Sequence, residues 1–286
     1  MPPVDADWPL VSIVFLSYNR RDELARSLEQ VLGHLDYPAG RLEVIVVDNA
    51  SADGTPEMLR DRFPHVRLIR SPENVGASAW NVGMTTARGD WRMILDDDCH
   101  ISGDALKTAV QRAEEHHADL VSFHVLSGTT PGYSFEDEYR TGLLTFWGCA
   151  AMFSRRAIES EPFYDPRIFI WANEMELTMR LLDRGFRHLY LPEVEPVHMK
   201  DPNPPFADRS NRFIVRQHRK HHLTGLGNRS GRLLERCPLT LQSPRLLPPQ
   251  IINDQAVARF DQVCRHATAH PARTDKSQGF HKSSRR

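Results

Sequence analysis

The sequence predicts an α/β fold of the Rossmann type, in which a mainly parallel sheet is flanked by helices. Short apolar segments rich in β-branched residues alternate with longer segments whose apolar residues recur at helical spacing. Clusters of polar residues directly follow several of the apolar segments. The 286 residues are 40% hydrophobic and 26% charged, a globular composition that excludes a collagen-like or wholly disordered chain.

The first half of the chain, residues 9–100, carries the clearest alternation. Continuous apolar runs such as LVSIVFL and LEVIVV are typical of strands buried on both faces. Pro56 suits the first turn of a helix, where a missing N–H costs nothing. In order, the pattern predicts strand 10–16, helix 21–35, strand 42–47, helix 56–62, strand 66–70, helix 78–87 and strand 91–95.

The second half, residues 101–205, is more mixed. Helical spacing and a terminating Gly185 define a helix over 173–184. The other expected elements are helix 104–117, strand 120–125, loop 127–140, a strand or close-packed turn within 143–153, and strand 188–191. We expect residues 1–205 to form one domain, followed by a basic and partly disordered extension over 206–286.

Charge is distributed unevenly along the chain. Residues 1–199 carry 19 Lys or Arg and 31 Asp or Glu, whereas residues 200–286 carry 17 and 6. The acidic body is not typical of a nucleic-acid-binding protein, and we expect no nucleic-acid partner. The basic tail is a candidate for peripheral contact with an anionic membrane.

The sequence also predicts a cellular location. No signal peptide and no apolar run of about 18 residues is recognisable. The four cysteines are far apart and form no C-x-x-C pair, which argues against a disulfide framework. We therefore expect a cytoplasmic protein with peripheral membrane contact.

Polar clusters at three predicted strand ends indicate one site. The carboxyl ends of parallel strands meet at one edge of a sheet, where ligands bind. Crowded carboxylates raise each other's pKa, and a divalent cation such as Mg²⁺ or Mn²⁺ relieves that repulsion. The clusters are Ser17-Tyr18-Asn19, Asp48-Asn49 and Asp96-Asp97-Asp98.

Four blocks resemble family 2 glycosyltransferases, which have the GT-A fold and use nucleotide sugars. Their matching order and spacing are far more specific than a lone Asp-x-Asp. The resemblance covers roughly residues 9–202 and leaves out the tail. The blocks are VSIVFLSYNRRDELARSLEQVL, EVIVVDNASADGT, SPENVGASAWNVGMTTARGDWRMILDDD and FIWANEMELTMRLLDRGFRHLYLPEVEPVHMKDP.

The resemblance implies an inverting, metal-dependent transferase. It would move a sugar from a nucleoside-diphosphate sugar to a hydroxyl of a glycan, lipid or small molecule. Asp96, Asp98 and the closing His198 would hold the divalent metal, Mg²⁺ or Mn²⁺. Residues 9–100 would bind the donor and residues 101–205 the acceptor. The implied nucleotide-sugar contacts are Ser17, Asn19, Asp48, Asn74, Gly76, Asn81, Asp96 and Asp97.

The implied general base lies on the predicted helix over 173–184. Asn173-Glu174-Met175-Glu176 stands where the family has Glu-Asp-x-Asp. Glu174 aligns with the residue that deprotonates the acceptor, and Glu176 stays an alternative. Asn in place of the first acid, and Glu in place of Asp, depart from the family pattern. Trp147 and Trp171 would either stack on an acceptor sugar or pack in the core.

Other functional classes stay open at this point. The departure at Asn173 and the unmatched tail are consistent with a catalytically degenerate nucleotide-sugar-binding protein. A nucleotidyltransferase also uses aspartates and a metal, but the Gly-rich, Lys-bearing loop expected for it is absent after the first strand. A dinucleotide oxidoreductase is disfavoured because no G-x-G-x-x-G follows that strand.

Overall fold

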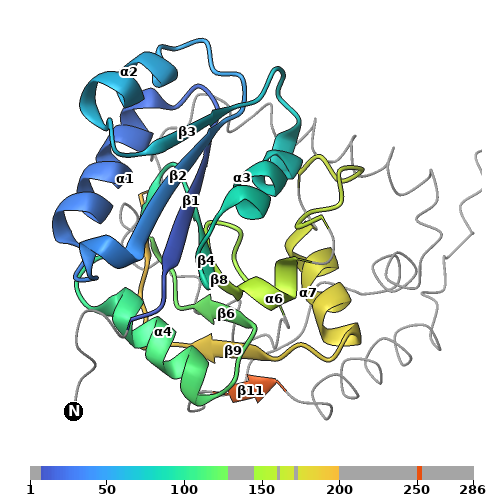
Figure 1. Ribbon diagram of the computed structural model, residues 1–286. Helices are drawn as coiled ribbons and strands as arrows, with labels where there is room; N and C mark the ends of the chain where they lie inside the picture. The colour runs from blue at the N-terminus through green and yellow to red at the C-terminus, as the bar shows by residue number, and fades with distance from the viewer. Residues whose placement is uncertain (1–7, 128–144, 160–161, 171–172, 200–249, 253–286) are drawn as a thin grey trace, which may run out of the picture.

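The computed structural model describes residues 8–127, 145–159, 162–170, 173–199 and 250–252. Its main layer is an eight-stranded sheet with the strand order β11-β9-β6-β8-β4-β1-β2-β3 (Figure 1). The pairs β1-β2, β1-β4, β2-β3 and β6-β9 are parallel, whereas β8 is antiparallel to both neighbours and β11 to β9. The predicted mainly parallel α/β fold is confirmed.

The first half contains each element that the pattern predicts. Only the helix expected over 78–87 differs clearly, because a 3-10 turn precedes it and the α-helix begins at Trp80. The elements are β1 (Val11–Ser17), α1 (Arg21–His34), η2 (Ala39–Arg41), β2 (Leu42–Asp48), α2 (Thr55–Arg62), β3 (Arg67–Arg70), η3 (Gly76–Ala79), α3 (Trp80–Thr86) and β4 (Trp91–Asp96).

The second half departs further from its pattern. The strand expected over 120–125 ends at Phe123, and the strand within 143–153 begins only at Ala150. The elements are β5 (Cys99–His100), α4 (Ala105–Glu115), β6 (Leu120–Phe123), β7 (Leu126–Ser127), β8 (Ala150–Ser154), α6 (Arg155–Ile158), α7 (Asn173–Asp183), β9 (His188–Leu191), β10 (Val197–His198) and β11 (Gln250–Ile252).

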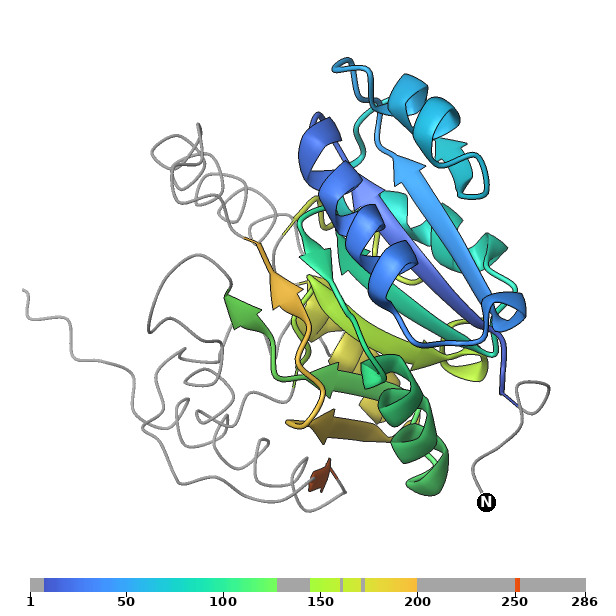
Figure 2. The same cartoon turned by 90° about the vertical axis from the view of Figure 1, so that its left-hand side faces the viewer.

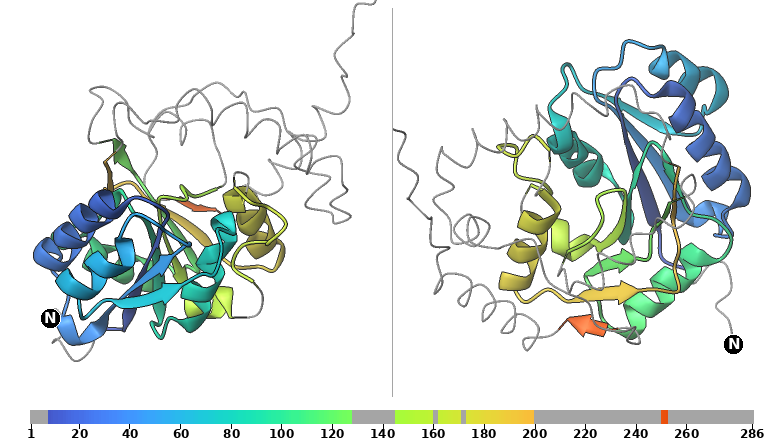
Figure 3. Two further views of the ribbon diagram at one scale, coloured as in Figure 1. Left: turned by 90° about the horizontal axis from the view of Figure 1, so that it is seen from above. Right: turned by 180° about the vertical axis from the view of Figure 1, so that it is seen from behind.

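Helices cover both faces of the sheet. Helices α1, α2 and α4 lie on one face, and α3, α6 and α7 lie on the other (Figures 1 and 3). Alternate residues of β1 point to opposite layers, so Ile13 and Phe15 join the first core and Val14 joins the second. All three side chains are fully buried, which explains why this strand is a continuous apolar run.

A second, three-stranded sheet has the order β5-β10-β7 (Figure 2). In the pairing of β5 with β10, His198 lies opposite Cys99, directly after the aspartate run. The backbone N–H of Met199 donates to the carbonyl of Asp98 at 2.7 Å. This small sheet therefore joins the end of the first half to the end of the second.

Apart from Ser127, which ends β7, the expected loop over 127–140 lies outside the described residues, as does almost all of the expected extension over 206–286. Within that extension, Gln250–Ile252 pair with β9 at the edge of the main sheet. No helix among the described residues is both long and apolar enough to cross a membrane.

Candidate active site

The aspartate run turns away from the main sheet at the end of β4. Asp97 and Asp98 are buried, and the Ser27 hydroxyl of α1 donates to the Asp97 carbonyl at 2.8 Å. Asp96, Asp98 and His198 each present a ligand atom, and these atoms all lie within 4.8 Å of one another. Burial, nearby Cys149 and the charge of Asp98 raise the pKa of Asp96 well above its usual range. A divalent cation would relieve this crowding, so the three residues suit a metal site.

Arg20 neutralises part of this acidic cluster. Its guanidinium lies 3.2 Å from Oδ1 of Asp97 and 2.8 Å from Oδ2 of Asp98. Burial raises the pKa of Asp97 to about 7 although Arg20 opposes the shift. Burial acts on Asp98 too, but the hydrogen bond and charge of His198, together with Arg20, lower the pKa of that carboxyl. Asp98 is therefore the better anionic ligand of the two.

His198 reaches the aspartate run from β10. Its Nε2 lies 2.9 Å from Oδ1 of Asp98. Burial alone would lower the pKa of His198, but hydrogen bonds with Asp98 and Cys149 outweigh it and raise the value to about 10. A hydrogen bond with the buried Cys99 thiol, and the neighbouring His198, lower the pKa of Cys149 to about 6 against the effect of burial. The two thiols thus line the inner side of the predicted metal site.

The loop after β1 packs on the loop after β2. Asn19 has a left-handed backbone (φ 54°), its N–H donates to Ser51 Oγ at 2.9 Å, and its Oδ1 accepts from the Ala52 N–H at 2.7 Å. Asp48 is fully buried and accepts from the Ser51 N–H at 3.0 Å and from Arg70 Nε at 3.3 Å. Ser17 is also buried at this edge. Ser17, Asn19 and Asp48, which are predicted to contact the nucleotide sugar, therefore lie together.

The loop before α3 is held by amide hydrogen bonds. Asn49 Nδ2 donates to Asn74 Oδ1 at 2.9 Å, and the same oxygen accepts from the Gly76 N–H at 2.9 Å. Gly76 has φ +65°, and a Cβ there would overlap the carbonyl of Phe169. The backbone that comes close to Gly76 is thus that of another segment of the same chain. Its role toward a nucleotide sugar stays a prediction.

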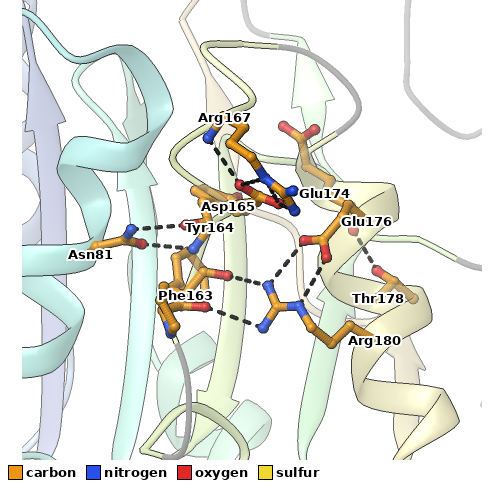
Figure 4. A network of polar contacts seen from close by, with 10 residues as sticks. Asn81, Phe163, Tyr164, Asp165, Arg167, Glu174, Glu176, Thr178 and Arg180 are labelled. Atoms are coloured by element: carbon orange, nitrogen blue, oxygen red, sulfur yellow. Dashed lines mark hydrogen bonds and ion pairs between the residues drawn. The ribbon is translucent and has the colours of Figure 1, made fainter. Parts of the chain in front are cut away.

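Asn81 lies farther along α3 and is engaged by another part of the chain. Its Nδ2 donates to the Tyr164 carbonyl at 2.8 Å, and its Oδ1 accepts from the Tyr164 N–H at 2.7 Å (Figure 4). The predicted contact of Asn81 with a nucleotide sugar would compete with this double hydrogen bond.

The two candidate bases on α7 have different surroundings. Glu176 is held by Arg180, whose Nε and NH2 donate to its two oxygens at 2.9 and 3.0 Å (Figure 4). Among the described residues the Glu174 carboxylate has no ion-pair partner, and its own backbone N–H donates a hydrogen bond to it. Burial raises the pKa of Glu174 to about 7. Glu174 therefore suits the predicted role of general base better than Glu176, because it can gain and lose a proton near neutral pH.

Gly148 joins this carboxylate to the aspartate edge. A Cβ on Gly148 would overlap Oε1 of Glu174. The next residue, Cys149, accepts a hydrogen bond from the Asp96 N–H at 3.1 Å through its carbonyl. The structure thus brings Glu174 to the same edge as the predicted metal ligands, although 78 positions separate Glu174 from Asp96 in the sequence.

The two predicted acceptor residues have different outcomes. Trp147 is partly buried and packs against the core on the face of the sheet that α1, α2 and α4 cover. Trp171 lies outside the described residues. Sequence reasoning did not single out Arg20, Cys149, Arg70 or Tyr164 for this edge. Arg20 directly follows a polar strand end, which is a usable signal, but the other three enter the site through long-range packing.

Comparisons with known proteins agree with this geometry. A family model described as glycosyl transferase family 2 matches residues 12–171, which is more than half of the chain. The succinoglycan biosynthesis protein ExoO of Rhizobium meliloti (strain 1021) is 36% identical over 121 residues, or 42% of this chain and 34% of ExoO. Glycosyltransferase AglE of Haloferax volcanii is 31% identical over 121 residues, or 41% of this chain and 40% of AglE. The matches thus span less than half of the length of these relatives.

Solved structures share the fold. A mannosyltransferase from Pyrobaculum calidifontis in complex with GDP-Man and Mn²⁺ has a TM-score of 0.63 at 22% identity, covering 93% of this chain and 71% of that one. Residues 1–349 of TarS from S. aureus, in complex with UDP-GlcNAc, have a TM-score of 0.59 at 18% identity, covering 75% and 66%. The family match and these likenesses in fold lead to one conclusion: the chain belongs to glycosyl transferase family 2.

Proposed function

We propose that the chain is an inverting, metal-dependent glycosyltransferase that uses a nucleoside-diphosphate sugar. The observation that carries the proposal is the position of the half-buried Glu174 carboxylate at the edge that holds Asp96, Asp98 and His198. This edge is the carboxyl end of the parallel strands, where α/β folds bind ligands. The solved relatives with GDP-Man and UDP-GlcNAc support this class of donor.

The chemistry follows from the two sides of the site. Deprotonated Glu174 accepts the proton of the acceptor hydroxyl, whose oxygen attacks the anomeric carbon. The bond from that carbon to the diphosphate oxygen breaks, and the nucleoside diphosphate leaves from the opposite face, so configuration inverts. Asp96, Asp98 and His198 would hold a divalent cation that neutralises charge on the leaving diphosphate.

We propose Mn²⁺ as the better of the two metals expected. Mg²⁺ prefers oxygen ligands and retains water, whereas imidazole suits softer divalent ions. The predicted ligands include one imidazole beside two carboxylates. The complex of the P. calidifontis relative with Mn²⁺ is consistent with this choice.

The experiment that tests the function measures release of nucleoside diphosphate from a panel of nucleotide sugars, with Mn²⁺, with Mg²⁺ and with chelator. Metal-dependent release from one donor, lost in Asp98→Ala, is the expected result. Binding of UDP or GDP with no transfer to any glycan, lipid or small-molecule acceptor would instead favour a degenerate binding protein. Release of pyrophosphate from a nucleoside triphosphate would favour a nucleotidyltransferase.

The location proposed for the protein is cytoplasmic, with peripheral membrane contact. The excess of basic residues over 200–286 supports attraction to anionic lipid. Co-sedimentation with phosphatidylserine vesicles that disappears in high salt is the expected result. Equal sedimentation with neutral vesicles would contradict it.

A further inference from the structure

A segment between α6 and α7 connects the two halves of the molecule. We call residues 162–170 the strap. Its first residues lie beside α7, and Tyr164 contacts α3 (Figure 4). Its end reaches η3. None of these contacts is local, because Asn81 and Tyr164 are 83 positions apart.

Arg180 of α7 holds the first residues of the strap. Its NH1 donates to the Pro162 carbonyl at 3.1 Å, and its NH2 donates to the Phe163 carbonyl at 2.9 Å. Glu176 fixes the guanidinium from the other side (Figure 4). Because a guanidinium is planar and presents several donors at once, it can bind two carbonyls and a carboxylate together. The carboxylate that is not the predicted base therefore has a structural task.

Asn81 and η3 hold the rest of the strap from the first half. Asn81 binds both backbone groups of Tyr164, as a neighbouring strand would. At the far end, the Ala77 N–H donates to the Phe169 carbonyl at 2.7 Å, and Gly76 leaves room for that carbonyl. The strap is thus tied to the same loop that carries the predicted donor contacts Asn74 and Gly76.

Tyr164 links the strap to the helix that carries the predicted base. Its side chain is 1% exposed and packs in one core with Leu177 and Leu181 of α7. Burial and the charges of Glu174 and Asp96 raise the pKa of its hydroxyl well above the usual value. The side chain of Tyr164 therefore packs against α7, the helix that carries the predicted base.

We infer that Asn81 and Arg180 are positioning residues that set the place of Glu174 through the strap, rather than groups that bind the donor. The inference rests on the proposed function of Glu174 as the base. A displacement of such a carboxylate by about 1 Å can lower the rate by about 100-fold. The contacts that hold the strap should therefore affect the rate as well as the stability of the fold.

The test compares Asn81→Ala with Val82→Ala, a substitution of an exposed neighbour on the same helix. Affinity for UDP and for GDP, each with Mn²⁺, is measured by calorimetry, and kcat is measured with the donor found above. We expect Asn81→Ala to keep nucleotide affinity within about twofold and to lower kcat by about 10-fold to 100-fold, and Val82→Ala to change neither. Weaker nucleotide binding with unchanged kcat would overturn the inference and assign Asn81 to the donor.

A double-mutant cycle asks whether Asn81 acts through the base. In the Glu174→Gln background, Asn81→Ala should lower kcat by less than about twofold, because the group that it positions is already lost. An equal loss in both backgrounds would contradict the inference. The kcat of Arg180→Lys should lie between those of the wild type and Arg180→Ala, since lysine keeps the charge but not the planar array of donors.

Hydrogen exchange separates failure of the inference from failure of the proposed function. Amide exchange over α7 is compared between the wild type and Asn81→Ala, with no need for turnover. Faster exchange in α7, on the far side of the strap from the substitution, is the expected result. Unchanged exchange would overturn the inference even if the wild-type protein transfers no sugar.

Discussion

The two halves of the molecule place their functional side chains by different means. In the first half, polar residues directly follow β1, β2 and β4, so parallel pairing alone carries them to one edge of the sheet. In the second half, Glu174 lies at that edge against Gly148, which stands just before β8, the strand that runs antiparallel beside β4. A site at strand ends is thus encoded locally, whereas the predicted base depends on contacts distant in sequence.

The same contrast holds between the charges of the two halves. The aspartate run is compensated by Arg20 and His198, both within 3.2 Å. Glu174 has no charged partner among the described residues, and burial raises the pKa of its carboxyl to about 7. The aspartates of the first half are paired with cationic side chains, as expected for a metal site. Glu174 can gain and lose a proton, as expected for a proton acceptor.

The largest expected effect comes from the first half. Asp98→Ala removes a predicted metal ligand together with the partner of Arg20 and His198. We expect Mn²⁺-dependent transfer to fall by about 100-fold to 1000-fold, since a bound metal contributes several kcal/mol to charge stabilisation. The initial rate against Mn²⁺ concentration checks this. Metal-dependent transfer that survives in Asp98→Ala would show that the cluster is not the metal site.

The comparison of Glu174 with Glu176 is sharpened by matched substitutions. Glu174→Gln should lower kcat by about 100-fold, within the usual contribution of a general base. Glu176→Gln should lower kcat by less than about tenfold but reduce thermal stability, because Arg180 loses its anionic partner. Rates and unfolding curves of the two variants together decide the assignment. The reverse ranking of rates would make Glu176 the base.

The pKa of Glu174 predicts a pH profile. The base must be deprotonated to act, so kcat should rise with pH and level off above a pKa of about 7. Two units below that value, at pH 5, the rate should be about 100-fold below the plateau. The profile is measured at saturating Mn²⁺. A flat profile between pH 5 and pH 8 would argue against a base with a raised pKa.

Gly148→Ala gives the smallest expected effect on the site. The new methyl group would overlap the Glu174 carboxylate and displace it. We expect kcat to fall by about 10-fold to 100-fold while affinity for nucleoside diphosphate stays the same. Gly103→Ala serves as a control for a Gly-to-Ala change away from the site, since no atom lies within 4 Å of a Cβ there, although its φ of +60° is strained for alanine. Full activity in Gly148→Ala would show that Glu174 does not act in catalysis.

The sequence by itself determined the alternation of strands and helices in the first half and the positions of its polar strand ends. These follow from residue patterns within about 15 positions, where period and turn chemistry decide the local structure. The same patterns placed α7 and its two glutamates. The choice between Glu174 and Glu176 stayed open, because both stand in the first turn of one helix.

Only the tertiary structure separated those two carboxylates. Arg180, the strap carbonyls and Gly148 come from different segments, and which of them contacts a given glutamate depends on how the helix packs. The engagement of Asn81 by Tyr164 and the approach of Phe169 to Gly76 are likewise long-range contacts. Burial and desolvation, which set the pKa of Glu174, are properties of the packed molecule and have no counterpart in residue spacing.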